Sequence, residues 1–463
     1  MNRLVKFEID ELYGIKNYSI KIDDNKVILV GENGSGKTTI FKIMYYTLSC
    51  DWDALCRFVF KCIRLFFSNG EIIVVESEML QNIFTINDID RVSYYIDGRR
   101  SRRTYSESLI NELINLKESI TESSEEELKK MNIRGMYPDK YIQSLIEEKV
   151  VTELYLLTKK IRENFNATIL YLPTYRRIEE QLKNIFPNVD REEWAKRRKY
   201  GRSDRAIELV EFGMEDVESA VKAYKENLNE FSRAHQNKLT LGYLGEIIGE
   251  KYEQVGIESI NSLSEQQISD ILQRIDITIL SEKQKQEIRQ ILLRVRNETG
   301  FNNVKDKIVC HYFLKLIDLD KSLSEEEAAL LKFIDKCNKY LVNNILIYDN
   351  IDFSCKIYNR VKSFSENRKQ ETLKEIHFQD MSSGEKQIVS LFSHLNLTQK
   401  KNLFVFIDEP ELSLSVDWQK MFLVDVLDSV SCVGLIATTH SPFIFDNELE
   451  KYVHGINEFC VRE

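Results

Sequence analysis

The fold is decided by the stretch KVILVGENGSGKTTIFKIMYYTL, residues 26–48. It opens with a short continuous apolar run, which is typical of a strand buried on both faces of a sheet. Residues 31–38 then match the pattern G-x-x-x-x-G-K-[ST], and the residues after them have the composition of a helix. A strand, a glycine-rich loop and a helix in this order surround a phosphate group with backbone N–H groups at the positive end of the helix dipole. The stretch therefore predicts an α/β fold built around a phosphate-binding loop.

The loop itself supplies the residues expected to bind ATP. Lys37 should reach the β- and γ-phosphates, and the hydroxyl of Thr38 should ligate Mg²⁺. The alternative is a glycine-rich turn before an ordinary helix, which the strand on one side and the helix on the other disfavour. The nucleotide-binding residues predicted here are Asn33, Gly34, Ser35, Gly36, Lys37, Thr38 and Thr39.

A second apolar run ends in acidic residues. LFVFIDEPELSL, residues 403–414, predicts a buried strand whose carboxyl end carries two carboxylates. Ligands of open α/β sheets bind at that edge. Asp408 is the predicted second partner of Mg²⁺, and Glu409 is placed to polarise an attacking water. Solvated acids at a strand end are the simpler interpretation, but the phosphate-binding loop needs such a counterpart.

Two shorter motifs complete the set. MSSGEKQIVSLFSHL (381–395) begins with Ser382 and Glu385 in the capping-box pattern S-x-x-E, at the start of an amphipathic helix. Alone, this pattern favours a capped helix over an anion site. In LIATTHSPFIF (435–445), a buried strand brings His440 to the same sheet edge as the two carboxylates. A lone histidine at such an edge is more often structural, but this position favours a contact with the γ-phosphate.

In this order, GENGSGKTT, MSSGEKQ, FIDEPE and ATTHSP resemble the Walker A, signature, Walker B and switch-histidine motifs of the ABC/SMC-type ATPases. The resemblance implies that two heads sandwich two MgATP, so a homodimer or a higher homo-oligomer is expected. It also implies that Ser382 and Gly384 of one copy bind the γ-phosphate held by the other, and that Glu409 and His440 are catalytic. The family's LSGGQ becomes MSSGE here, a variant similar to the SMC-like branch.

The motifs divide one head into two stretches of sequence. The N-terminal lobe is predicted at 1–180 and the C-terminal lobe at 374–463. Residues 181–373 between them are charged and poor in Gly and Pro, with apolar residues at helical spacing near 268–275. The predicted fold class is therefore an ABC-type (SMC-like) α/β ATPase head, split in sequence by a mostly helical insertion. That insertion is either a coiled coil or a shorter, folded-over domain. Candidates for the family's Q-loop glutamine and D-loop aspartate are Gln81 and Asp417.

Composition narrows the class of protein further. The sequence contains no run of about 18 apolar residues and no apolar signal core at its N-terminus, so we expect a cytoplasmic protein without a membrane partner. The net charge of −10 argues against a surface that grips nucleic acid as a whole, because phosphate neutralisation needs clustered Lys and Arg. The eight cysteines lack zinc-ligand spacing and are expected to be free thiols.

Within the SMC-like branch, YLPTYRRIEE, ELVEFGMEDVESAV and EPELSLSVDWQ look like the compact ATPases of bacterial anti-phage systems. These include the ATPase subunits of PARIS and Septu and the ATPase half of the OLD nucleases; the length and layout are most similar to the PARIS subunit. The resemblance implies an ATP-driven sensor or scaffold that holds a separately encoded effector, a Toprim-type or other nuclease, and answers a phage-encoded trigger. OLD proteins continue into a Toprim domain, and from the short stretch after His440 we expect no such domain here.

Two other functions stay open. A DNA-repair or recombination ATPase of the SMC/RecF type would bind DNA directly. A transporter's nucleotide-binding subunit is disfavoured by the insertion and by the signature variant. Two basic clusters, at 99–103 and 196–205, are either solvated surface or contacts with DNA or with an acidic protein.

Overall fold

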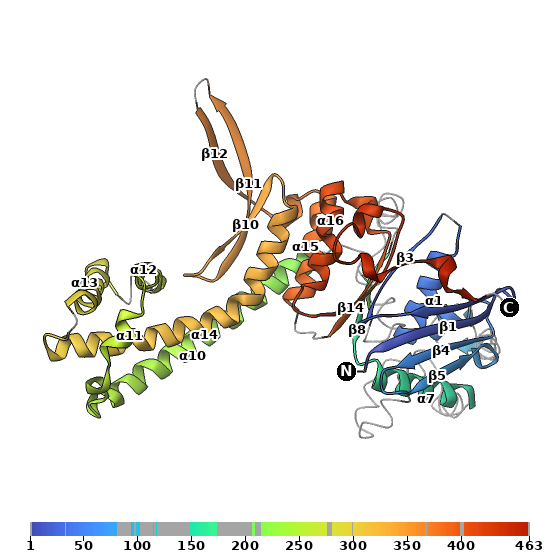
Figure 1. Cartoon of the computed structure of the whole chain (residues 1–463), viewed down its shortest axis with the longest axis horizontal. Helices are drawn as coiled ribbons and strands as arrows, with labels where there is room; N and C mark the ends of the chain where they lie inside the picture. The colour runs from blue at the N-terminus through green and yellow to red at the C-terminus, as the bar shows by residue number, and fades with distance from the viewer. Residues whose placement is uncertain are drawn as a thin grey trace. The chain divides into compact units, whose positions relative to one another are not determined.

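The computed structural model describes residues 2–32, 34–80, 94–96, 99–101, 114, 117, 149–173, 206–208, 214–275, 280–298, 300–365, 368–398 and 402–461. The chain divides into two compact units (Figure 1). The first comprises Met1–Glu211 and Gln399–Glu463, and the second comprises Phe212–Thr398.

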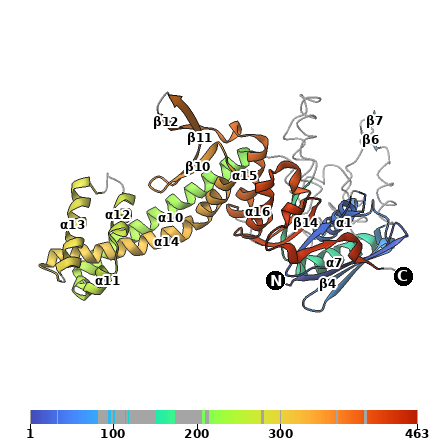
Figure 2. The ribbon, with the colours of Figure 1, turned by 45° about the horizontal axis from the view of Figure 1, so that its top comes forward.

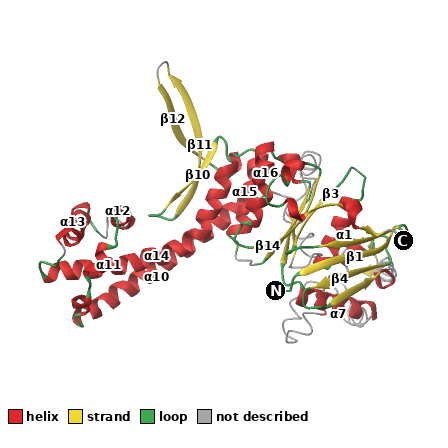
Figure 3. Cartoon of the chain, in the orientation of Figure 1, coloured by secondary structure: helices red, strands yellow, loops and turns green. Residues whose placement is uncertain are grey.

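A six-stranded parallel sheet forms the centre of the first unit (Figure 3). Its strands are, in spatial order, β15 (Val453–Gly455), β3 (Lys26–Val30), β14 (Cys432–Thr439), β13 (Leu403–Asp408), β8 (Thr168–Leu172) and β9 (Ala206–Glu208). All six residues of β13 are buried. Strands covered on both faces consist of continuous apolar runs, so the strands at 26–30 and 403–408 could be predicted.

Helix α1 (Lys37–Ser49) packs on this sheet through aromatic rings. The Phe41 ring lies 5.3 Å from that of Phe406 on β13, and the Tyr45 ring lies 4.4 Å from that of Tyr171 on β8. Such pairs add about 0.5–1.5 kcal/mol each beyond the area that they bury. They fix the start of α1, and therefore the loop before it, against the sheet.

A five-stranded antiparallel sheet makes the second layer of this unit. Its order is β16 (Cys460–Val461), β2 (Lys16–Lys21), β1 (Leu4–Leu12), β4 (Cys62–Phe67) and β5 (Ile72–Glu76). Turns at Tyr13-Gly14 and Asn69-Gly70 join β1 to β2 and β4 to β5, with Gly14 at φ +70° and Gly70 at φ +84°. Helix α7 (Lys149–Asn164) packs against β5. One face of the sheet is apolar and buried in the core, through Phe7, Ile9, Ile20, Ile63 and Leu65.

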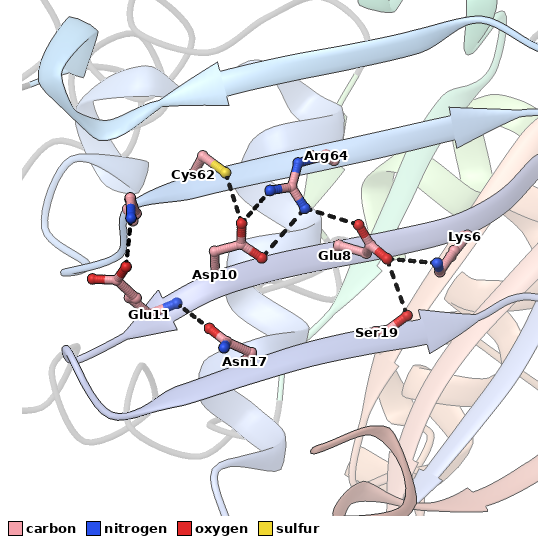
Figure 4. A network of polar contacts seen from close by, with 9 residues as sticks. Lys6, Glu8, Asp10, Glu11, Asn17, Ser19, Cys62 and Arg64 are labelled. Carbon is pink, nitrogen blue, oxygen red and sulfur yellow. Dashed lines mark hydrogen bonds and ion pairs between the residues drawn. The ribbon is translucent and has the colours of Figure 1, made fainter. Parts of the chain in front are cut away.

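The opposite face carries a ladder of paired charges (Figure 4). Glu8 accepts from Arg64 at 3.0 Å and pairs with Lys6 at 2.5 Å, and Asp10 pairs with Arg64 and accepts from the Cys62 thiol at 3.1 Å. Burial raises the pKa of Glu8, but the bonds from Lys6 and Arg64 outweigh it, so the pKa lies below its ordinary value. Half-buried charges on a sheet face are tolerated when they are paired in this way.

The second unit contains two long helices that run side by side, α10 (Met214–Ile248) and α14 (Val304–Tyr340) (Figures 1 and 2). At one end they carry a small helical cluster of η2 (Lys251–Gln254), α11 (Ile257–Asn261), α12 (Glu265–Arg274) and α13 (Glu282–Glu298), with its own apolar core. Near the other end, α15 (Ser383–Asn396) packs on both helices, and the rings of Tyr340 and Phe392 lie 5.6 Å apart.

A buried carboxylate ties three elements of this unit together. Glu327 of α14 is 1% exposed, pairs with Arg274 at the end of α12, and accepts from the hydroxyl of Tyr348 at 2.7 Å. Arg274 also pairs with Asp320 at 2.6 Å. Removing one partner of such a pair leaves a buried charge unpaired, which costs about 3–5 kcal/mol. The cluster therefore locks α12 and β10 (Asn344–Asp349) onto α14.

The insertion is helical, as predicted, but it also contains a three-stranded antiparallel sheet of β10, β11 (Ser354–Ser365) and β12 (Arg368–Ile376). The unit boundaries at 211/212 and 398/399 differ from the predicted 180/181 and 373/374. The signature helix α15 lies in the second unit because its apolar face packs on α10 and α14.

The mixed α/β fold with a parallel sheet and a helical insertion is thus confirmed. Of the helices in the described ranges, none is long and apolar enough to cross a membrane. None of the eight cysteines, all of which lie in the described ranges, forms a disulfide.

We predict that Gly434→Ala destabilises the first unit by about 1–3 kcal/mol, the usual cost of overpacking a core. A Cβ at Gly434 would lie 2.3 Å from the Phe404 ring and 2.8 Å from the carbonyl oxygen of Asn25. All three tryptophans have numbers within the first unit, so tryptophan fluorescence in a urea titration reports its unfolding. Gly242→Ala, on an exposed and open position of α10, is the matched control and should leave that transition unchanged. An unchanged midpoint in Gly434→Ala would contradict the close packing.

Candidate functional site

The phosphate-binding loop has the backbone that its glycines predict. Gly34 and Gly36 adopt φ angles of +79° and +95°, which disfavour any residue with a side chain, and Gly36 is the N-cap of α1. A Cβ at Gly31 would lie 2.9 Å from the Ser35 Oγ. Asn33 lies outside the described residues. The backbone therefore turns tightly in front of the helix N-terminus, where an anion is favoured.

Lys37 is folded into this loop. Its Nζ donates to the carbonyl oxygens of Gly31 at 2.6 Å and Glu32 at 2.9 Å, and the residue is 4% exposed. Burial lowers the pKa of Lys37, while the nearby charges of Glu409 and Asp408 oppose that shift. An ammonium group bonds more strongly to an anionic oxygen than to the neutral carbonyl oxygens that Lys37 contacts here. The lysine and the helix end together fit a phosphate group.

One further observation supports this fit. The hydroxyl oxygen of Ser35 is buried and has no hydrogen-bond partner among the described residues. Buried polar atoms are rarely left unpaired unless a ligand or an ion completes them. Thr38 and Thr39 follow in the first turn of α1 and are partly exposed.

Asp408 lies at the carboxyl end of β13, 2% exposed. The Thr438 hydroxyl, on the neighbouring strand β14, donates to its Oδ1 at 2.5 Å. This bond fixes the orientation of the carboxylate. Thr438 was not among the predicted site residues; in the sequence it is the first of the two threonines that precede His440.

Glu409 has an unusual backbone for a glutamate, with φ 50° and ψ 63°. Its N–H donates to the Thr438 carbonyl at 3.1 Å, which holds it in this left-handed conformation. Its Oε1 lies 3.4 Å from His440 Nε2. Burial and, next, the charge of Asp408 raise the pKa of Glu409, while His440 opposes the rise. A carboxylate with a raised pKa beside an imidazole is suited to accept a proton.

Ser382 and Gly384 belong to the second unit. Ser382 is exposed and is the N-cap of α15, and the predicted capping box with Glu385 is confirmed: the Ser382 hydroxyl lies 2.8 Å from Glu385 Oε2. Glu385 is buried and its other oxygen accepts from Asn344 of β10 at 3.0 Å. Gly384 is partly buried.

The remaining candidates are placed only in part. Asp417 is exposed in the first turn of α16 (Val416–Leu427). Gln81 and the basic cluster at 196–205 lie outside the described residues, and for the cluster at 99–103 only the backbone of 99–101, strand β7, is described. Sequence reasoning also missed Glu411 and Gln419, whose contacts are discussed below.

A parallel sheet whose edge presents a phosphate-binding loop, a buried aspartate and a glutamate–histidine pair defines the class of P-loop nucleotide-binding proteins. The family follows from comparison with known proteins. Residues 3–445 match the AAA ATPase domain family, and the chain belongs to this family.

The solved structures similar to the chain include SMC heads. One is an Smc head bound to the C-winged helix domain of ScpA, with 14% identity and a TM-score of 0.32 over 96% of this chain and 90% of that chain. A second is an Smc head with an extended coiled coil, bound to the C-terminal domain of ScpA and derived from Pyrococcus furiosus. It has 13% identity and a TM-score of 0.33 over 96% of this chain and 91% of that chain. A third is an Smc head with a coiled coil and joint, derived from Pyrococcus yayanosii. It has 16% identity and a TM-score of 0.30 over 96% of this chain and 93% of that chain. No curated relative matches the chain.

We predict that Glu409→Gln binds ATP but hydrolyses it about 100-fold more slowly, the usual scale for a lost general base. The amide keeps the size of the side chain but cannot take up a proton from water. Lys37→Ala is the paired variant and should lose ATP binding itself. Binding is measured with a fluorescent ATP analogue and turnover by phosphate release. Wild-type turnover in a folded Glu409→Gln would assign the role of base elsewhere.

Proposed function

We propose that the chain binds and hydrolyses ATP with Mg²⁺ at composite sites between two copies. In this proposal it is the sensor or scaffold subunit of an anti-phage defence system. The observation that carries the ATPase assignment is the convergence of Lys37, Asp408, Glu409 and His440 on one edge of the parallel sheet. Their charges act on one another, and each has a distinct chemical role.

The residues divide the work as follows. Lys37 would exchange the carbonyls of Gly31 and Glu32 for phosphate oxygens, and Thr38 and Asp408 would hold Mg²⁺. The bound ion would neutralise the charge that develops on the phosphates. Glu409 orients a water and takes up its proton, which its raised pKa favours. His440 faces Glu409 and stabilises its ionised form before the proton arrives.

The second half of each site is proposed to come from another copy of the chain. Ser382 is exposed at the N-terminus of a 14-residue helix, where backbone N–H groups attract an anion. Its capping box pre-forms this helix end. Resemblance to the ABC/SMC-type ATPases supports contact of Ser382 and Gly384 with the γ-phosphate on the partner copy. A homodimer is the smallest assembly that completes both sites.

We predict that mixing Lys37→Ala with Ser382→Arg restores part of the ATPase activity that each variant lacks alone. In a mixed dimer, one composite site contains both substitutions and the other contains neither. The control is Lys37→Ala mixed with the double variant Lys37→Ala/Ser382→Arg, which can form no intact site. Absence of rescue, with subunit exchange shown by labelled copies, would rule out composite sites.

The defence role rests on resemblance and on the second unit. An ATP-gated pair of heads with a long helical arm can hold a partner in one nucleotide state and release it in another, provided that the partner binds the two states differently. We propose that this partner is a separately encoded effector, a Toprim-type or other nuclease, and that a phage-encoded protein is the trigger. Direct contact of the basic clusters with DNA would favour the repair or recombination alternative instead.

We predict that pull-down of the chain from cells expressing its native locus recovers the product of a neighbouring gene, and that the isolated chain does not cut DNA. Lys37→Ala in the same locus tests whether capture depends on the nucleotide. Gel shifts with a salt titration test direct DNA binding. Mg²⁺-dependent cleavage by the isolated chain that survives Lys37→Ala would refute the separate effector.

A further inference from the structure

The loop that carries His440 is held from both sides by the segment that follows β13. This segment comprises η4 (Pro410–Ser413) and the start of α16. Glu411 Oε1 accepts from the backbone N–H of His440 at 2.6 Å. One residue further on, the Ser441 hydroxyl donates to Gln419 Oε1 at 2.6 Å. The two bonds fix the chain immediately before and after the histidine side chain.

Gln419 is also bonded on its other side. It is 8% exposed, and its Nε2 donates to the carbonyl oxygen of Leu414 at 3.0 Å. A single buried amide therefore joins the turn before α16 to the loop after β14. Two bonds and burial leave this side chain one orientation, so a shift of the turn at Leu414 must move Ser441 as well.

We propose that Glu411 and Gln419 are positioning residues that hold His440 opposite Glu409, and that Gln419 makes this alignment depend on the turn that begins α16. The inference rests on the proposed ATPase function and adds to it. Neither residue has to touch the nucleotide, since each acts through the His440 loop. Val416 and Asp417, in the first turn of α16, are exposed. A contact that shifts this turn would therefore shift the His440 loop as well.

The geometry at Glu409 explains why alignment matters. Its carboxylate is 3.4 Å from His440 Nε2, at the limit of a useful contact. Asp408, Glu411 and Lys37 are the other charged groups that act on it. Displacement of a catalytic group by about 1 Å can lower a rate by about 100-fold. A loop free to move by that distance would separate the imidazole from Glu409.

The test is steady-state ATPase kinetics on the full chain. Glu411→Ala should lower kcat about tenfold, within the range for a misplaced catalytic group, and change the KM for ATP by less than about threefold. Glu411→Gln keeps an acceptor oxygen and should recover most of the loss. Glu448→Ala is the control for the loss of charge and size, because Glu448 is an exposed glutamate.

Gln419→Ala and Ser441→Ala cut the same link and should each lower kcat. Their double variant should be no slower than the slower single variant, because interactions in one link are not additive. Ser441→Ala removes only a hydroxyl, so it keeps the test valid if Gln419→Ala unfolds. Tryptophan fluorescence checks the fold of every variant.

The split between kcat and KM separates positioning from a structural role, because a displaced His440 should lower kcat while the KM for ATP stays close to that of the wild type.

Each result decides the proposal. Wild-type kcat in Glu411→Ala and Gln419→Ala would overturn it, as would loss of ATP binding in step with kcat. A wild-type chain that does not hydrolyse ATP would refute the proposed function, and the positioning role with it. That outcome is recognised in the wild type alone, before any variant is measured.

Discussion

The site depends on the register of one strand. β14 pairs in parallel with β13, where Thr438 lies opposite Asp408, and with β3, where Thr439 lies opposite Val30. The end of β3, where the phosphate-binding loop begins, and the end of β13, where the carboxylates lie, are therefore level with each other. Because side chains alternate along a strand, a slip of one residue would turn Thr438 away from Asp408. The buried apolar residues of all three strands prevent that slip.

The same region accepts local strain that the core compensates. Glu409 has a left-handed backbone, Lys37 is buried, and Gly434 lies against an aromatic ring. A residue in a sparsely populated backbone region costs about 1–3 kcal/mol and persists only where its surroundings determine it. Here the bond from Glu409 N–H to Thr438 and the buried strands on either side provide those surroundings. The strain directs the Glu409 carboxylate toward His440.

How much could be predicted from the sequence depends on how local the cause is. The phosphate-binding loop, the buried strands and the capping box of Ser382 follow from neighbouring residues, and the structure contains all three. Glu411 and Gln419 could not be predicted, because their contacts with the His440 loop join residues 22 or more positions apart. The sheet of β10 to β12 was hidden by its charged, alternating composition, which resembles an exposed helix. The place of α15 depends on packing against helices distant in sequence.

The arrangement of α14 has a mechanical consequence. Its 37 residues give a rigid rod about 55 Å long, from the rise of 1.5 Å per residue. Helix α15 packs against one end of this rod near Tyr340, and the small helical cluster packs against the other end around Cys310 and Phe313. If α15 and the rod tilt together by about 5°, the far end travels about 5 Å at that length. The buried pair of Glu327 and Arg274 stiffens α14 between its ends. A displacement of α15 too small to disturb its apolar packing would therefore move the small helical cluster by about one helical pitch.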